Sequence, residues 1–182
     1  MISKIFSNHF IILIWLASLL MMHLSFHFPD EKDHSDFERF TGRWSLFVVE
    51  SKVDSISAWM PRKDHYKNRQ GFIIYDGIGG MGVHHVTEHY QDYQFESYGA
   101  PDNLTTNDLK HLANNFVYFG KYRVIDSLKI IEHHIESSNL PRLWATVEKR
   151  AYVFSDDTLT LSPITDRYPK SRLKWVKMDD EW

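Results

Sequence analysis

The feature that most constrains the fold of this chain is a series of short segments rich in β-branched and aromatic residues. Eight such segments occur, at residues 43–51, 71–76, 81–89, 116–125, 128–137, 145–154, 158–162 and 172–178. Runs of this composition predict β-strands, and the Gly, Asn, Asp, Ser and Pro residues between them predict turns. Because four of the turns are short, neighbouring strands are expected to be antiparallel.

One segment, residues 106–115, has the pattern of a short inserted helix, with Thr105 or Thr106 as its N-cap and Leu109 and Leu112 on its buried side. Eight antiparallel strands with one inserted helix predict an all-β protein that folds as a closed up-and-down barrel, because closure removes the exposed sheet edges. A barrel of this size can hold side chains or one small ligand. A β-sandwich is the alternative, since the number of strands does not separate the two.

The N-terminal segment is expected to be a hydrophobic helix outside this domain. An apolar run at residues 10–22 follows Lys4, and a charged stretch begins at Asp30. Residues 1–29 are interpreted as a cleaved signal peptide or an uncleaved membrane anchor. Residues 30–39 are then a charged linker, and residues 40–182 the barrel domain. This organisation predicts a protein that is membrane-anchored or secreted (periplasmic in a bacterium).

Composition excludes several classes of function. The net charge of −3 and the lack of a basic stripe argue against nucleic-acid binding, and the absence of cysteine excludes disulfides and thiolate metal sites. No phosphate-binding loop, dinucleotide fingerprint or nucleophile elbow occurs, so no cofactor is expected. The oligomeric state is left open.

Seven short motifs, in order, resemble those of the lipocalin-like domain family, a calycin-type barrel. They are Gly42-Arg43-Trp44, Gly71–Asp76 with Gly80-Met81, Phe116–Tyr122, His133–Glu136, Arg150 on the following strand, Thr158–Ser162, and Leu173-Lys174-Trp175. The resemblance implies a barrel whose Trp44 packs across the closed end, covered by Arg172 or Lys174. The segment at residues 140–149 lacks the asparagine and the glycine of the family pattern, and for much of the family no biochemical role is established.

The adjacent histidines of Ile130–Glu136 (IIEHHIE) are the most conspicuous polar feature. Successive side chains of a strand point to opposite faces, so His133 and His134 are not expected to share one site. The resemblance places Arg150 on the neighbouring strand, and we therefore expect His134 inside, in a polar cluster with Glu132, Glu148 and Arg150. If the isoleucine face is inside instead, His133 occupies the lumen and needs a polar partner.

A second histidine group contains His84, His85 and His89. Its spacing does not give the two same-face ligands of a His-x-His metal strand, so no metal site is predicted, although His85 and His89 share a face.

Aromatic side chains are the stronger indication of binding. Tyr118 and Tyr122 share one strand face, and Gly120 between them leaves room for a ligand or a crossing backbone. The predicted ligand-binding residues are Tyr75, Tyr118, Tyr122, His134, Trp144, Arg150 and Tyr152, which either contact a ligand or fill the barrel.

The leading interpretation is a barrel that binds a small hydrophobic ligand in its lumen. The alternative is a cofactor-independent isomerase, cyclase or hydratase that acts on a hydrophobic substrate there, with His134, Glu148 and Arg150 as catalytic candidates. A purely structural role is the third possibility, and a lumen filled by its own aromatic side chains would favour it.

Overall fold

The computed structural model describes residues 35–95 and 101–179. The predicted signal or anchor at residues 1–29 and the first part of the predicted linker lie outside these ranges. Within the two described ranges, no helix is long and apolar enough to cross a membrane.

The strands form one antiparallel sheet in which β1 also pairs with the last strand, β9, and thereby closes a barrel. The strands are β1 (Gly42–Lys52), β2 (Met60–Pro61), β3 (Gln70–Tyr75), β4 (Gly80–Val86), β5 (Phe116–Ile125), β6 (Ile130–Ser138), β7 (Val147–Ser155), β8 (Thr158–Pro163) and β9 (Lys170–Lys177). The two-residue β2 pairs with the end of β1, and the other eight strands make the barrel wall. The predicted closed barrel is confirmed, and the β1–β9 pairing excludes the sandwich.

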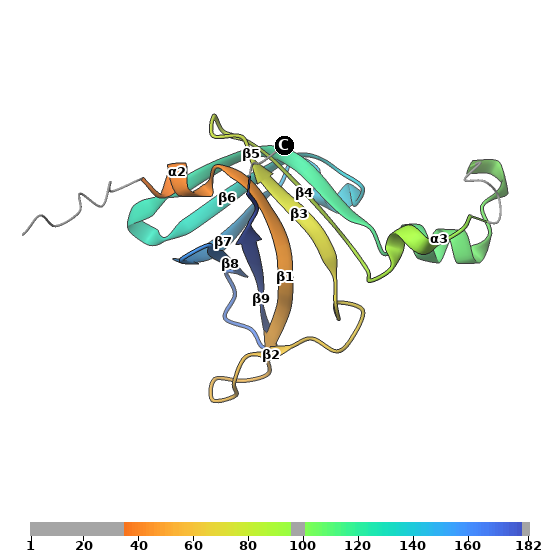
Figure 1. The fold of residues 1–182 in the computed structure, drawn as a ribbon, viewed down its shortest axis with the longest axis horizontal. Helices are drawn as coiled ribbons and strands as arrows, with labels where there is room; N and C mark the ends of the chain where they lie inside the picture. The colour runs from red at the N-terminus through yellow and green to blue at the C-terminus, as the bar shows by residue number, and fades with distance from the viewer. Residues whose placement is uncertain (1–34, 96–100, 180–182) are drawn as a thin grey trace, which may run out of the picture. The chain divides into compact units, whose positions relative to one another are not determined.

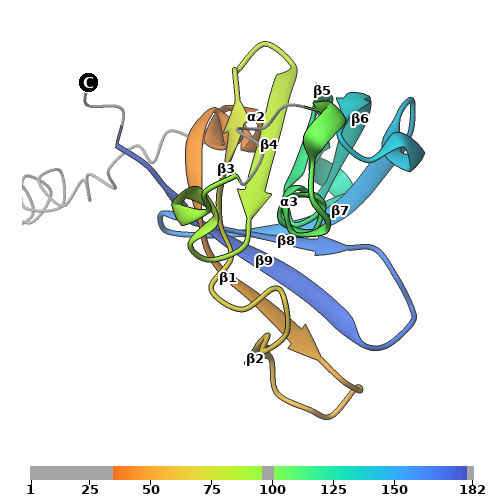
Figure 2. The same cartoon turned by 90° about the vertical axis from the view of Figure 1, so that its right-hand side faces the viewer.

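The two ends of the barrel differ in their connections (Figures 1 and 2). At one end lie the short helix α2 (Asp36–Phe40) and the tight β3–β4, β5–β6 and β7–β8 turns. At the other end lie the longer connections, including residues 53–69, the insertion that carries α3 (Thr106–Leu112), and the 3-10 turn η4 (Pro141–Leu143). We call these the closed end and the open end.

Helix α3 begins where the sequence predicts. The Thr105 hydroxyl accepts a hydrogen bond from the Asp108 N–H (3.2 Å), and the Asp108 carboxylate accepts one from the Thr105 N–H (2.9 Å), which completes a capping box. The helix ends at Leu112 rather than Asn115, and Leu109 is 54% exposed. The prediction that Leu109 is buried is wrong, because α3 belongs to an insertion at the open end rather than to the core.

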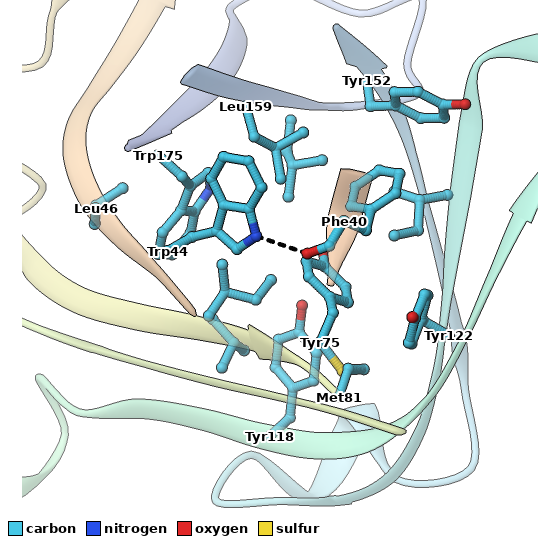
Figure 3. Packing of buried hydrophobic residues seen from close by; sticks show 14 of the residues in the cluster. Phe40, Trp44, Leu46, Tyr75, Met81, Tyr118, Tyr122, Tyr152, Leu159 and Trp175 are labelled. Carbon is cyan, nitrogen blue, oxygen red and sulfur yellow. Dashed lines mark hydrogen bonds between the residues drawn. The ribbon is translucent and has the colours of Figure 1, made fainter. Parts of the chain in front are cut away.

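An aromatic cluster fills the closed end. Phe40, at the end of α2, is fully buried, and its carbonyl oxygen accepts a 2.8 Å hydrogen bond from the indole N–H of Trp44 (Figure 3). The rings of Tyr75, Tyr152 and Phe154 meet the Phe40 ring edge-on at centroid distances of 4.8–5.1 Å. Edge-to-face contacts of this kind add to the stability that burial itself supplies.

Polar contacts attach α2 to the barrel. The carboxylate of Asp36 forms an ion pair with Lys129, and its Oδ2 lies 2.6 Å from the hydroxyl of Tyr152. That hydroxyl also lies 2.9 Å from Asp126 Oδ1 in the β5–β6 turn. Residues 36–39, which the sequence analysis assigns to the linker, thus form part of the closed end.

The cation over Trp44 is not the one expected. Lys177 Nζ lies 4.6 Å from the Trp44 ring centroid, whereas the Arg172 guanidinium lies 4.4 Å from the ring centroid of Trp59. The strand register explains the difference, because Trp44 pairs with Lys177 across β1 and β9 and Arg172 pairs with Glu50 nearer the open end. The expectation that Arg172 or Lys174 covers Trp44 is wrong.

Replacement of the closed-end tryptophan provides a test of this packing. We expect Trp44→Ala to lower the free energy of unfolding by roughly 3–5 kcal/mol, because a large ring and its hydrogen bond are lost from a fully packed site. Trp144→Ala is the matched control, since Trp144 is 54% exposed and should change stability by less than about 1 kcal/mol. Urea denaturation of both variants measures the difference, and equal losses would contradict the placement of Trp44.

Candidate functional site

The lumen contains a cavity of about 280 Å³ toward the open end of the barrel. Its inner wall is apolar, and its outer rim carries residues from the open-end connections. The lining residues are Val49, Arg62, Tyr66, Ile73, Val83, His85, Phe116, Tyr118, Arg142, Arg150, Leu161, Pro163, Ser171, Leu173 and Trp175. The arrangement combines apolar surface with a small number of polar groups, as ligand sites do.

A larger hollow of about 640 Å³ lies against the outer face of β3, β4 and β5. Val83 and Tyr118, which also line the lumen cavity, contribute to it, and its other lining residues belong to the outer face, where Phe72, Ile74 and Phe119 are each about half exposed. It is a surface feature rather than part of the lumen.

Beside the cavity, a buried histidine links two tyrosines. His133 is fully buried; its Nε2 lies 2.9 Å from the Tyr75 hydroxyl and its Nδ1 lies 2.8 Å from the Tyr118 hydroxyl. Tyr118 also lines the cavity. The three side chains therefore form a hydrogen-bonded chain that runs from the cavity wall into the core.

All three groups of this chain are neutral near pH 7. Burial, together with the nearby charge of Arg150, depresses the pKa of His133 well below its ordinary value. Burial raises the pKa of both Tyr118 and Tyr75. A neutral imidazole donates from one nitrogen and accepts at the other, so both tyrosine hydroxyls are satisfied by one ring.

The two adjacent histidines point to opposite faces of β6, as predicted, but the favoured orientation is wrong. His133 faces the lumen, and His134 lies on the outer face with 43% of its side chain exposed. The β6–β7 register decides this, because Glu148 is paired with His133 and Arg150 with Ile131. Directly opposed residues share a face.

On the outer face, His134 belongs to a cluster around Glu132. The Glu132 side chain is 3% exposed and contacts Lys149 Nζ at 3.0 Å, Arg123 Nη2 at 2.7 Å and His134 Nε2 at 3.2 Å. The hydrogen bond from Lys149, supported by those from Arg123 and His134, lowers the pKa of Glu132 to about 2. The expected lumen cluster of Glu132, His134, Glu148 and Arg150 is therefore divided by the barrel wall.

Two predicted ligand-binding residues, Tyr118 and Arg150, line the cavity. Glu148 faces inward on β7 but is not among the lining residues, and its Oε2 lies 3.8 Å from Arg150 Nη2. Arg150 is thus the strongest charged candidate that the sequence identifies.

Three other predicted residues belong to the packed core instead. Tyr75 does not line the cavity, and its hydroxyl is hydrogen-bonded to the buried His133. Tyr122 stacks on Phe37 at a centroid distance of 5.1 Å. The hydroxyl of Tyr152 lies beside Asp36 at the closed end. Of the two roles predicted for these side chains, ligand contact or filling of the barrel, the structure shows the second.

Trp144 differs from its expected role, whereas Gly120 has one of its two expected roles. Trp144 is more than half exposed and donates a 2.7 Å hydrogen bond to the Ser138 carbonyl outside the cavity. Gly120 gives room to a backbone and not to a ligand, since a Cβ built on it would lie 2.1 Å from the His134 carbonyl oxygen. This close approach adjoins a register shift between Phe119 and Gly120.

Several lining residues were not identified as site residues from the sequence. His85 is 5% exposed, and burial followed by the charge of Arg69 lowers its pKa to about 3, so it is neutral. The two-residue alternation of β3 and β4 could have assigned Ile73, Val83 and His85 to one face. Arg62 lies in the long connection between β1 and β3, where no alternating pattern in the sequence could have predicted that it lines the cavity.

Among the side chains that the structure describes, no three or more His, Cys, Asp or Glu residues are grouped so as to hold a metal ion.

A family model for the lipocalin-like domain matches residues 41–177, which span the barrel from β1 to β9. The chain belongs to the lipocalin-like domain family. Comparison with curated proteins and with solved structures found no match. The resemblance of the seven motifs to this family is therefore confirmed.

The two histidines of this lipocalin-like domain provide a matched pair of variants. We expect His133→Ala to lower the free energy of unfolding by roughly 2–5 kcal/mol, because it leaves a cavity and two buried hydroxyls without their partner. His134→Ala should cost less than about 1 kcal/mol, since Lys149 and Arg123 still hold Glu132. Equal losses in chemical denaturation would contradict the assignment of the two faces.

The Glu132 cluster predicts a pH dependence of stability. The folded pKa of about 2 lies below the ordinary value of 4.5, so the unfolded chain binds more protons in this interval. The carboxylate therefore stabilises the fold above about pH 4.5, and this contribution is lost as the pH falls toward 2. We expect Glu132→Gln to be destabilised at pH 7 by roughly 1–3 kcal/mol, with the difference from wild type shrinking in acid.

Glu136→Gln is the control for this experiment. Glu136 lies on the same strand face and contacts Lys121 at 3.5 Å, but its side chain is 54% exposed. Thermal unfolding between pH 3 and pH 7 should show a pH-dependent difference for Glu132→Gln and little for Glu136→Gln. A constant offset for Glu132→Gln across this range would refute the depressed pKa.

Proposed function

We propose that this lipocalin-like domain binds a small hydrophobic molecule in its lumen. The observation that carries the proposal is the cavity of about 280 Å³, which Ile73, Val83, Leu161 and Trp175 bound with apolar surface. Burial of apolar ligand surface against such walls provides roughly 25 cal/mol for each Å² removed from water. The cavity opens beside the long connections, where a ligand can enter without passing the aromatic cluster.

The dimensions of the cavity favour a compact ligand. Pockets for drug-sized molecules typically measure about 300–1,000 Å³, and this lumen lies at the lower edge of that range. Phe116, Tyr118 and Trp175 contribute aromatic surface to the lining, which suits a ligand with a ring or a short apolar chain.

Lumen-filling substitution tests this proposal. Full-length protein is dialysed against 2-naphthol, a compact and uncharged aromatic probe, and Val83→Trp is expected to weaken binding by about tenfold or more by filling the cavity. His84→Trp is the matched control, because it places the same indole one residue away on the outer face of β4. Val83 borders the outer hollow as well, but its side chain is buried in the barrel. Probe that binds to the outer hollow or to the apolar N-terminal segment is therefore expected to bind Val83→Trp as it binds wild type.

The proposal fails if wild-type protein does not bind the probe, or if Val83→Trp binds it as well as wild type does. A loss confined to His84→Trp would place the binding site in the outer hollow. Circular dichroism verifies that each variant is folded, and Val83→Phe provides a milder change should the larger residue prevent folding.

A second candidate is a cofactor-independent isomerase, cyclase or hydratase. The hydrogen bond between the cavity-lining Tyr118 and the neutral, buried His133 favours it, because such a pair can move a proton to or from a bound molecule. The originally favoured His134 lies outside the lumen and plays no part. Mass spectrometry of the small molecules that co-purify with wild type and with Tyr118→Phe distinguishes the two functions. If the protein is an enzyme, the two proteins should retain different molecules. If it only binds a ligand, they should retain the same one.

A further inference from the structure

The rim of the lumen carries an excess of positive charge. Three of the residues that line the cavity are the arginines Arg62, Arg142 and Arg150, and none of the described lining residues is Asp or Glu. Arg62 is already paired, since its guanidinium contacts Asp64 and lies 4.1 Å from the Tyr66 ring centroid. Arg150 has only a distant ionic contact, with Glu148 at 3.8 Å, so its charge is incompletely compensated beside a largely apolar chamber.

Arg150 is the most deeply placed of the three. Its side chain is 14% exposed and faces inward from β7, and its Nη2 lies 3.8 Å from Glu148 Oε2, a distance too long for a hydrogen bond. Its Nη1 is buried and has no hydrogen-bond partner among the described residues. A buried guanidinium N–H without an acceptor is costly, because the charged group has lost water without gaining a full replacement.

The remaining polar groups around the cavity do not supply that acceptor. The imidazole of His85 is occupied by Arg69, whose Nε contacts Nδ1. Nδ1 and Nε2 of His133 are both engaged by tyrosine hydroxyls. A second unpartnered donor belongs to a lining residue, since the indole N–H of Trp175 is buried without a hydrogen-bond partner among the described side chains and backbone. The cavity lining therefore carries two buried N–H donors that no described acceptor satisfies.

We propose that the lumen ligand is a compact carboxylic acid whose carboxylate binds Arg150 and whose apolar body lies against Ile73, Val83 and Leu161. This inference rests on the proposed function and adds the chemical class of the ligand. A carboxylate supplies two acceptor oxygens in the plane that a guanidinium fork matches. The apolar inner wall would accommodate the hydrocarbon part of the ligand. A ring in the ligand would contact the aromatic residues of the lining.

A pair of nearly isosteric probes tests the charge requirement. Full-length protein is titrated at pH 7.5 with 2-naphthoate and with its neutral amide, 2-naphthamide, by isothermal calorimetry. We expect wild type to bind the naphthoate about tenfold or more tightly than the amide, since hydrogen bonds to charged groups are the stronger ones. Arg150→Met should remove this difference by weakening naphthoate binding.

Lys121→Met is the matched control, because it removes one positive charge from an exposed side chain on the outer face of β5. It should leave the preference for naphthoate unchanged. Arg150→Lys keeps the charge but loses the fork, and an intermediate preference is expected. This variant also keeps the experiment decisive if Arg150→Met does not fold.

The outcomes separate this inference from the proposed function. If both probes bind wild type equally and Val83→Trp abolishes both, the lumen binds hydrophobic molecules and the carboxylate proposal is overturned. If the preference for naphthoate persists in Arg150→Met, Arg150 is not the anion-binding group and the proposal is likewise overturned. If neither probe binds although 2-naphthol does, the carboxylate proposal alone is overturned. If 2-naphthol does not bind either, or if Val83→Trp binds both probes as wild type does, the proposed function fails together with it.

Discussion

The pairing of β1 with β9 is the contact on which the rest of the structure depends. It converts a continuous antiparallel sheet into a barrel, so that the two faces of every strand become an inside and an outside. Without this closure the aromatic cluster, the buried histidine and the arginine rim would all lie on one exposed sheet face. Closure also removes the free edges of the barrel strands, which would otherwise be available to pair with other chains.

Once closed, the lumen is divided into two regions with different physical character. Toward the closed end, the rings of Phe40, Trp44 and Tyr75 pack together, and the hydroxyls and imidazole of the Tyr75–His133–Tyr118 chain satisfy one another. Among the residues that line the cavity, Arg150 and Trp175 each have a buried donor without a partner in the described part of the chain. Satisfied polar groups stabilise a core, whereas unsatisfied ones beside a cavity indicate where a ligand completes the hydrogen bonding.

Local pattern accounts for much of the fold and for part of the site. The alternation within β6 correctly separates His133 from His134, and the run of strands and turns correctly predicts the barrel. The same reasoning assigned His134 to the lumen, because alternation within one strand does not specify its offset from the next strand. A one-residue change of register would exchange the inner and outer faces of β6 relative to β7.

The sequence by itself determined the strand positions, the antiparallel order and the family, because these depend on residue composition, short turns and motif spacing along the chain. Only the tertiary structure decided that Tyr122 and Tyr152 are packing residues at the closed end and that Arg150 lines a cavity. It also decided that residues from distant connections, such as Arg62 and Arg142, meet at one rim. The physical reason is that burial depends on strand register and barrel closure, which are set by contacts between residues far apart in the chain.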